Sequence, residues 1–424
     1  MKQELESYFD RLWPICRSLT GNGNRETLKI LSEIVDLNIS EIPSGTVCFD
    51  WVVPPEWNAK EAWIKDSHGN IIVDFKNNNL HLLGYSVPFK GRMSLSELKS
   101  HLYTLPEQPD LIPYQTSYYK ERWGFCITHN QLLSLEDGEY EVYIDSSLNP
   151  KGSMTIADAL IKGETEEEVL LSTYICHPSM ASNELSGPLI SSFLYQLLKT
   201  KKLRYTYRFV FVPETIGSIC YLSMYGRHLK EKLVAGFVIT TIGDDGKFTY
   251  KKSRRENALP DRATELVLKQ QEKDYIIENF SPIGSDERQY CSPGFNLPVG
   301  SLMRTRYGKY KEYHTSADNK DFISFDAMQQ SINTYFDILN LIEANHKYIN
   351  KIQFCEPQLG KRGLYPTLIS QKENADFVSV MMWLLNLADG TNDLIDIANR
   401  SKAPYKLLID IAQQLVCKNL LAIN

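Results

Sequence analysis

Polar residues that could do chemistry lie next to apolar runs in this 424-residue sequence. They are His177, Glu214, Asp244 or its neighbour Asp245, Asp286 and His314. Two histidines and carboxylates from separate loops are suited to hold a zinc ion that keeps one position open to water. A further glutamate can take a proton from water in metal-assisted hydrolysis. Ligands on separate loops follow no local motif, so the alternative that each histidine is only structural stays open at this point.

The elements that must position these residues alternate between strand and helix from 168 to 345. We expect apolar strands at 168–176, 207–213 and 233–242, and amphipathic helices at 188–200 and 218–229. Strands this apolar predict an α/β fold with a mostly parallel sheet covered by helices on both faces. Ligands of such sheets collect at the carboxyl ends of the strands. His177, Glu214 and Asp244 each follow a predicted strand.

The segment before this region has a different pattern of predicted secondary structure. Residues 3–15 and 25–36 have helical spacing, and 46–150 predicts short strands separated by turns. Aromatic residues are frequent in 46–150: Trp51, Trp57, Trp63, Tyr114, Tyr118, Tyr119 and Trp123. We expect them to form the core of a small β-rich domain. The alternative is that they form the wall of a binding cleft.

The last part of the chain, 351–424, predicts three helices with the spacing of a winged helix-turn-helix. They are expected at 379–389, 392–401 and 404–424, with an Asn or Asp cap before the second. The segment contains eight basic and seven acidic residues and no basic run on its last helix. This balance argues against DNA reading and favours docking to a protein, or packing.

The composition predicts a soluble cytoplasmic protein. The net charge of −6 argues against bulk-charge binding of nucleic acid. No secretory signal is predicted at the start, and the longest apolar runs, such as 233–239, are much shorter than the roughly 20 residues of a membrane span. The eight cysteines are scattered, as is typical of a reducing compartment.

Several motifs carry a resemblance to the zinc aminopeptidase family. They are YICHPSMASNELSG (174–187), FVPETIGS (211–218) and GSDERQYCSPGFNLPVGSLMRTRYGKYKEYHTSADN (284–319). The resemblance implies that His177 and His314 bind metal and that Glu214 is the general base.

A narrower resemblance covers nearly the whole chain. RSLTGNG, PSGTVCFDWVVPPEW and IPYQTSYYKERWGFC, with PETIGS and GSDERQY, resemble bacterial aminopeptidase-like proteins encoded among polysaccharide-biosynthesis genes. This resemblance implies an aminopeptidase-like α/β domain at 1–45 and 151–350. It also implies an inserted β-rich domain at 46–150 and a winged helix at 351–424.

Three departures from the aminopeptidase pattern replace acids by neutral residues. Asn183 stands where the family has the Asp that bridges two zinc ions. Thr215 stands where the family has the acid after the base, and Thr240 where it has the ligand Asp that ends the next strand. Two dications about 3.5–4 Å apart need an anionic bridge. We therefore expect one zinc ion, held by His177, His314 and a carboxylate. Asp244 is the substitute within reach, and Glu184 is the alternative if the loop shifts by one residue.

Arginines near these stretches are candidates for substrate binding. Arg254, Arg288 and Arg304 could form a fork for a carboxylate or phosphate, as on an acidic sugar or a nucleotide-linked precursor. The alternative is that they are surface or salt-bridged residues. Asn183 and Asp286 complete the expected substrate-binding set. Arg17, in a glycine-rich stretch, is a further candidate contact for an anion.

The sequence thus favours a metal-dependent hydrolase of an amide bond with a reduced, single-metal site. Its expected substrate is a small molecule or a peptide- or sugar-linked compound. The alternative is a catalytically inactive binding or scaffold protein, because three acids are lost. A regulator that reads DNA is the least favoured alternative. A homo-oligomer, or a protein partner bound through the winged helix, is also compatible with the sequence.

Overall fold

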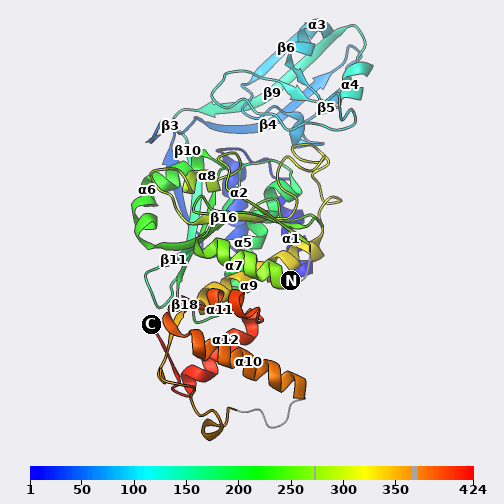
Figure 1. Cartoon of the computed structure of the whole chain (residues 1–424). Coiled ribbons are helices and arrows are strands. Elements are labelled where there is room, and N and C mark those ends of the chain that lie inside the picture. Colours follow the sequence, from blue (N-terminus) through cyan, green and yellow to red (C-terminus); the bar gives the residue numbers. More distant parts are fainter. Residues whose placement is uncertain (272–273, 365–370) are drawn as a thin grey trace. The chain divides into compact units, whose positions relative to one another are not determined.

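The computed structural model describes residues 1–271, 274–364 and 371–424, and for 371–376 the backbone alone. The chain divides into two compact units, and Figure 1 labels their elements. The first is Met1–Glu256 with Ile276–Ile332, and the second is Asn257–Tyr275 with Asn333–Asn424. No helix among the described residues is long and apolar enough to cross a membrane.

A mixed sheet of eight strands forms the centre of the first unit. Their order across the sheet is β1 (Asn38–Pro43), β10 (Ser153–Ile161), β12 (Thr206–Val212), β11 (Glu168–Tyr174), β13 (Leu233–Val238), β16 (Val299–Met303), β14 (Phe248–Lys251) and β15 (Tyr275–Glu278). The pairs β12–β11, β11–β13 and β13–β16 are parallel, whereas β1, β10 and β14 pair antiparallel. Every residue of β11 is buried, as expected for a strand covered on both faces. The predicted α/β fold with a mostly parallel central sheet is confirmed.

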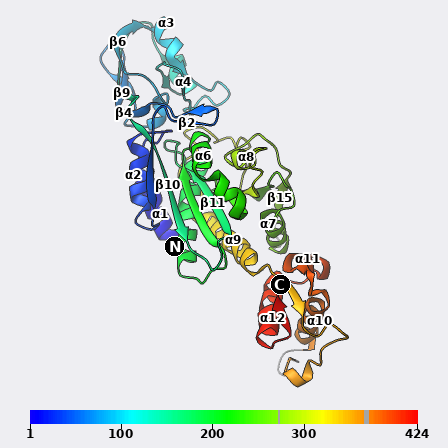
Figure 2. The same cartoon turned by 90° about the vertical axis from the view of Figure 1, so that its left-hand side faces the viewer.

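Helices cover both faces of this sheet, as Figure 2 shows. α1 (Lys2–Leu12) and α2 (Asn22–Leu31) lie on one face, together with α5 (Ser186–Lys199), which packs against α1, β10 and β11. α6 (Ile216–Lys232) and the short α8 (Glu287–Tyr290) lie on the other. A π-helical turn over Ala181–Leu185 leads directly into α5. Such turns occur frequently at functional sites.

A smaller antiparallel sheet is inserted between β1 and β10. Its strands are β5 (Ile71–Asp74), β4 (Glu56–Lys65), β9 (Glu139–Asn149) and β6 (Phe89–Ser94), in that order. Shorter elements in the same segment are β2 (Val47–Cys48), β3 (Trp51–Val52), α3 (Leu95–Leu98), β7 (Leu102–Tyr103), β8 (Phe125–Cys126) and α4 (His129–Ser134). Trp57 and Trp123 are buried in one apolar cluster that also contains Leu170 of β11 and Val210 of β12. The inserted segment therefore shares its core with the α/β sheet.

The second unit contains α7 (Leu259–Gln270) and the end of α9 (Phe325–Ala344), followed by the last part of the chain. That part consists of β17 (Lys347–Asn350), α10 (Gln371–Leu387), β18 (Asp389–Asp393), α11 (Leu394–Ser401), α12 (Tyr405–Cys417) and β19 (Leu421–Ile423). The three strands form a sheet in the order β18–β17–β19. Asp393 caps α11 in a capping box with Asp396, which agrees with the predicted cap.

Candidate functional site

A cavity of about 490 Å³ lies in the first unit at the carboxyl ends of β11 and β12. β11 ends at Tyr174, before His177, and β12 ends at Val212, before Glu214. Parallel strands bring their carboxyl ends to the same edge, so two residues far apart in sequence meet there. The residues that line the cavity include His177, Glu214, Thr215, Arg288, His314, Trp51, Tyr114, Tyr118 and Tyr119.

His177 is held from behind by two buried charged residues. One Glu184 oxygen, Oε2, accepts a hydrogen bond from the backbone N–H of His177 at 2.9 Å and lies 3.0 Å from its Nδ1. Arg17 Nε donates to the His177 carbonyl at 2.9 Å and lies 3.4 Å from the other Glu184 oxygen. We infer that the ring proton is on Nδ1, facing the carboxylate, which leaves the Nε2 lone pair for the cavity.

This arrangement bears on two expectations. Glu184 was an alternative metal ligand: its carboxylate contacts the Nδ1 side of His177, outside the lining of the cavity. There Cys176, His177 and Glu184 form a buried group whose potential ligand atoms lie within 4.8 Å of one another. Arg17 was a candidate contact for an anion, but its side chain is fully buried and bonded to the His177 carbonyl. The π-helical turn over Ala181–Leu185 is the local cause, because it places Glu184 beneath the histidine.

His314 is the second histidine of the cavity. It has a left-handed backbone, with φ of 57°, and its ring stacks on Tyr313 with the centroids 3.9 Å apart. Its centroid is 5.5 Å from that of His177. Its Nε2 is buried and has no hydrogen-bond partner among the described residues. Burial lowers the pKa of both histidines to about 3, so both rings are neutral at pH 7, as a metal ligand must be.

Glu214 lies beside this pair. Its Oε2 is 3.8 Å from His177 Nε2, and its Oε1 accepts a hydrogen bond from Ser285 Oγ at 2.7 Å. Its side chain is 27% exposed. Burial, followed by the nearby Asp286 charge, raises the pKa of Glu214. The carboxylate can therefore hold or release a proton near neutral pH, as a general base requires. Ser285 was not among the predicted site residues, although it directly precedes Asp286 in the motif GSDER.

Asp286 positions the turn that contains Glu214. Its Oδ1 accepts hydrogen bonds from the Thr215 backbone N–H at 2.7 Å and from Ser218 Oγ at 2.8 Å. Thr215 has a φ of 66°, which is unfavourable for a β-branched residue and is held by these contacts. Asp286 was predicted to bind substrate, but it is buried and lies outside the lining of the cavity.

Two of the three residues that replace the lost acids, Asn183 and Thr240, form a neutral cluster with Tyr174. The Tyr174 hydroxyl donates to Asn183 Oδ1 at 3.2 Å and is hydrogen-bonded to Thr240 Oγ1. The backbone N–H of Asn183 donates to the Asp318 carboxylate at 2.9 Å. Asn183 and Thr240 are almost fully buried and are not among the residues that line the cavity. The side chains of Asn183, Thr240 and Tyr174 carry no negative charge that could offset a second dication.

Three other predicted site residues also lie outside the lining of the cavity. Asp244 accepts hydrogen bonds from Thr305 Oγ1 at 2.6 Å and from the Gly246 N–H at 2.8 Å, so its carboxylate fixes its own loop. Arg304 is buried and bonds the Gly246 carbonyl at 3.0 Å. Arg254 is exposed. The structure thus brings His177, Glu214, His314 and Arg288 together and places Asp244, Arg254 and Arg304 elsewhere.

The aromatic residues of the inserted segment divide between the two roles considered from the sequence. Trp57 and Trp123 are buried in the apolar core, and Trp63 stacks on Tyr143. The other four line the cavity: Trp51, Tyr114, Tyr118 and Tyr119. The Tyr114 backbone N–H donates to the His314 carbonyl at 2.8 Å. The inserted segment therefore supplies the core of its own sheet and also one wall of the site.

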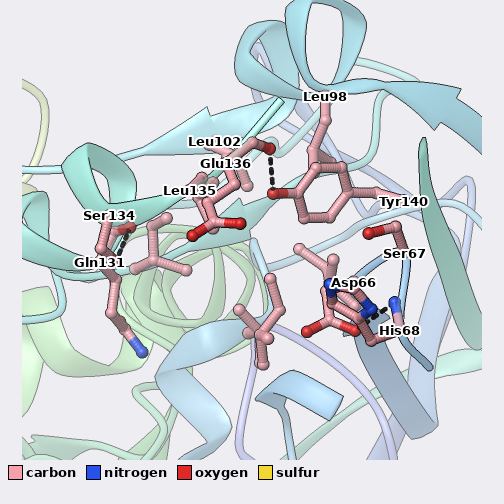
Figure 3. A pocket seen from close by; sticks show the side chains of 14 residues that line it. Asp66, Ser67, His68, Leu98, Leu102, Gln131, Ser134, Leu135, Glu136 and Tyr140 are labelled. Carbon is pink, nitrogen blue, oxygen red and sulfur yellow. Dashed lines mark hydrogen bonds between the residues drawn. The ribbon is translucent and has the colours of Figure 1, made fainter. Parts of the chain in front are cut away.

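A second cavity, of about 520 Å³, lies within the inserted segment (Figure 3). Two of its polar side chains, those of Asp66 and Tyr140, form hydrogen bonds within the lining. Asp66 accepts from the backbone N–H of His68 at 2.9 Å, and the Tyr140 hydroxyl donates to the Glu136 carbonyl at 2.7 Å. The rest of the lining includes apolar side chains such as Leu98 and Leu102. This cavity has no histidine pair and no paired base, so the first cavity is the candidate site.

The chain is similar to known protein families and to a named relative. A family model described as "Domain of unknown function (DUF4910)" matches residues 7–345, and one described as "winged helix-turn-helix" matches 346–423. The first match covers most of the chain. The chain belongs to the DUF4910 family. A Clostridium acetobutylicum protein named "Putative polysaccharide biosynthesis protein with aminopeptidase-like domain" is 47% identical over 403 residues, which cover 95% of this chain and 92% of that protein.

Solved structures place the family in the aminopeptidase fold. A crystal structure described as a "putative peptidase" from Clostridium acetobutylicum is 45% identical, with a TM-score of 0.94, over 100% of this chain and 96% of that one. A zinc aminopeptidase from Bacillus subtilis has a TM-score of 0.57 at 11% identity, over 80% of this chain and 94% of that one. The predicted resemblance to aminopeptidase-like proteins, and the winged helix, are confirmed.

Proposed function

We propose that this chain is a metal-dependent hydrolase that cleaves an amide bond with a single zinc ion. The observation that carries the proposal is the pair of histidine rings, with centroids 5.5 Å apart, beside Glu214. His314 Nε2 has no partner among the described residues, and His177 Nε2 is directed to Glu214 by the contact of Nδ1 with Glu184. Zinc binds imidazole nitrogens readily, and His177 and His314 supply two of the three protein ligands that a catalytic zinc usually has.

Each residue of the site has a distinct role in the proposed reaction. His177 and His314 would hold the ion, which when bound acts as a Lewis acid and lowers the pKa of water. Glu214, held at one oxygen by Ser285, accepts the proton of the attacking water and returns it to the leaving nitrogen. Glu184 and Arg17 orient His177. The Asn183 cluster makes a single ion the stoichiometry that we expect.

The biological context of the proposal comes from the close relative. Its name refers to polysaccharide biosynthesis. Together with the size of the cavity, about 490 Å³, this supports a small or sugar-linked amide as the substrate of our chain.

Metal analysis of the tag-free protein, purified without chelator, tests the proposal. We expect about one zinc per chain, and loss of that zinc in His177→Ala and in His314→Ala. His68→Ala is the matched control, because His68 is exposed and lies outside this cavity. Zinc that survives in the double variant His177→Ala/His314→Ala would refute the proposed site.

A second candidate function is a non-catalytic protein that binds a ligand or assembles a complex. The observation that favours it is the neutral cluster of Asn183, Tyr174 and Thr240. A complementation assay in the producing organism separates the two candidates. Glu214→Gln abolishes function if the chain is a hydrolase and leaves it intact if the chain is a scaffold.

A further inference from the structure

Arg288 is a cation at the cavity that forms no direct ion pair among the described residues, although its charge acts on the nearby Glu214 and Asp286 carboxylates. Its Nη2 donates to the neutral Thr215 Oγ1 at 3.1 Å, and its buried Nε has no hydrogen-bond partner. No carboxylate of the described residues lies within ion-pair distance of its guanidinium. A guanidinium that lines a cavity and keeps an unused N–H donor is suited to bind an anion from outside, because its planar N–H groups match a carboxylate.

The turn that contains Arg288 is fixed before any ligand arrives. Glu287 and Lys251 form an ion pair at 2.6 Å, and both side chains are fully buried. Lys251 also donates to the Ile283 carbonyl at 2.8 Å. On the other side of Arg288, Tyr290 donates to or accepts from Ser172 of β11 at 2.9 Å. Because α8 is anchored on both sides of Arg288, little conformational entropy of the backbone is lost when Arg288 binds a ligand.

Aromatic rings line the same cavity. Trp51 and Tyr119, 40% and 54% exposed, contact each other with centroids 6.3 Å apart. Tyr114 and Tyr118 share a hydrogen bond between their hydroxyls at 2.9 Å. Flat rings at a half-open cavity bind another ring or a sugar face, and a few polar groups then fix its orientation.

We propose that Arg288 binds a carboxylate of the substrate, so that this chain acts on an anionic, ring-containing amide. The inference rests on the proposed function for the amide that is cleaved, and it names the class of molecule that contains the amide. A free amino terminus, which aminopeptidases recognise, carries a positive charge that Arg288 repels. The charge preference of the site is therefore reversed relative to the proteins whose fold it shares.

Two probes of nearly equal shape, and a third that lacks their acetyl group, test the preference without any turnover. N-acetyl-L-tyrosine has a carboxylate, N-acetyl-L-tyrosinamide is neutral, and L-tyrosinamide has an ammonium group. Their affinities for the full-length protein are measured by saturation-transfer NMR. We expect the carboxylate probe to bind roughly 10-fold to 100-fold more tightly than the neutral one, as for hydrogen bonds to a charged group. The ammonium probe is expected to bind most weakly.

Variants assign the preference to one residue. Arg288→Leu is expected to remove the advantage of the carboxylate probe, and Arg288→Lys to retain part of it. Arg92→Leu, the matched control, removes an exposed arginine of β6 and leaves the preference unchanged. Thermal unfolding checks that each variant folds, and the ranking of the probes on the unaltered protein decides the matter if Arg288→Leu does not.

The outcomes separate this inference from the proposed function. Equal binding of the three probes, tightest binding of the ammonium probe, or no binding at millimolar concentration overturns the inference. The His177→Ala/His314→Ala variant lacks the metal ligands and Arg288→Leu lacks the guanidinium. If His177→Ala/His314→Ala loses zinc but keeps the ranking of the probes, the carboxylate preference does not depend on the metal, and the inference about Arg288 is supported.

Discussion

Glu184 offers the sharpest test of how the site is built. Its carboxylate accepts from the His177 backbone at 2.9 Å, lies 3.0 Å from the ring Nδ1, and is 3.4 Å from the Arg17 guanidinium. The side chains of Glu184 and Arg17 are fully buried. Burial raises the pKa of Glu184, and the Arg17 charge opposes that rise. Since a guanidinium keeps its charge, we expect the carboxylate to be ionised as its counter-charge.

Glu184→Gln removes that charge and preserves the shape of the side chain. Removing one partner of a buried ion pair leaves the other charge uncompensated, which costs about 3–5 kcal/mol. Loss of the carboxylate behind a metal-binding histidine is expected to weaken zinc binding about 10-fold to 100-fold. Urea denaturation measures the free energy of unfolding, and competition with a chelator measures zinc affinity.

A double-mutant cycle with Arg17→Met supplies the control. If the two charges compensate each other, the variant lacking both is more stable than the sum of the single losses predicts. A loss below about 1 kcal/mol in Glu184→Gln, the size of an ordinary hydrogen bond, would falsify the ion pair. Strict additivity of Glu184→Gln and Arg17→Met would refute it as well.

Three further predictions concern the base, the inserted segment and the neutral cluster. Glu214→Gln is expected to lower the rate of amide hydrolysis by at least about 100-fold and to leave the zinc content unchanged; a similar rate in both proteins would rule out Glu214 as the base. Hydrogen bonds from Arg25 lower the pKa of Glu56 to about 2, so this pair stabilises the fold above the unfolded-state pKa of about 4.3, and the contribution is lost as pH falls toward 2. Glu56→Gln should therefore flatten the acid limb of stability against pH by about 1–3 kcal/mol, and an unchanged limb would contradict the assignment. Asn183→Asp adds a buried charge with few donors beyond the Tyr174 hydroxyl, so we expect a loss of about 1–3 kcal/mol in metal-free protein that added zinc partly restores; a gain in stability without metal would show that the cluster already tolerates an anion.

Much of the fold could be predicted from the sequence because the central strands are apolar throughout. β11 is a run of buried residues, and such a run between helical segments is typical of a parallel sheet. His177 and Glu214 were predicted for the same reason, since each follows a strand whose carboxyl end is at the common edge. The Arg288 position followed from its motif, GSDER.

The rest of the site depends on loop geometry that has no periodic signal. Asp244 follows β13 by six residues, and the turn directs its carboxylate to Thr305 and Gly246. Glu184 lies behind His177 because of a π-helical turn, and no sequence pattern predicts that turn. Arg304 and Arg288 differ only in their surroundings, which the sequence does not show. Arg304 donates to the Gly246 carbonyl, whereas Arg288 lines the cavity.

The most direct test of the account is anomalous X-ray diffraction at the zinc absorption edge from crystals of tag-free protein. We predict one zinc peak per chain, next to the rings of His177 and His314 and beside Glu214. Two peaks bridged at Asn183, or no peak at the histidine pair after zinc is added, would contradict it.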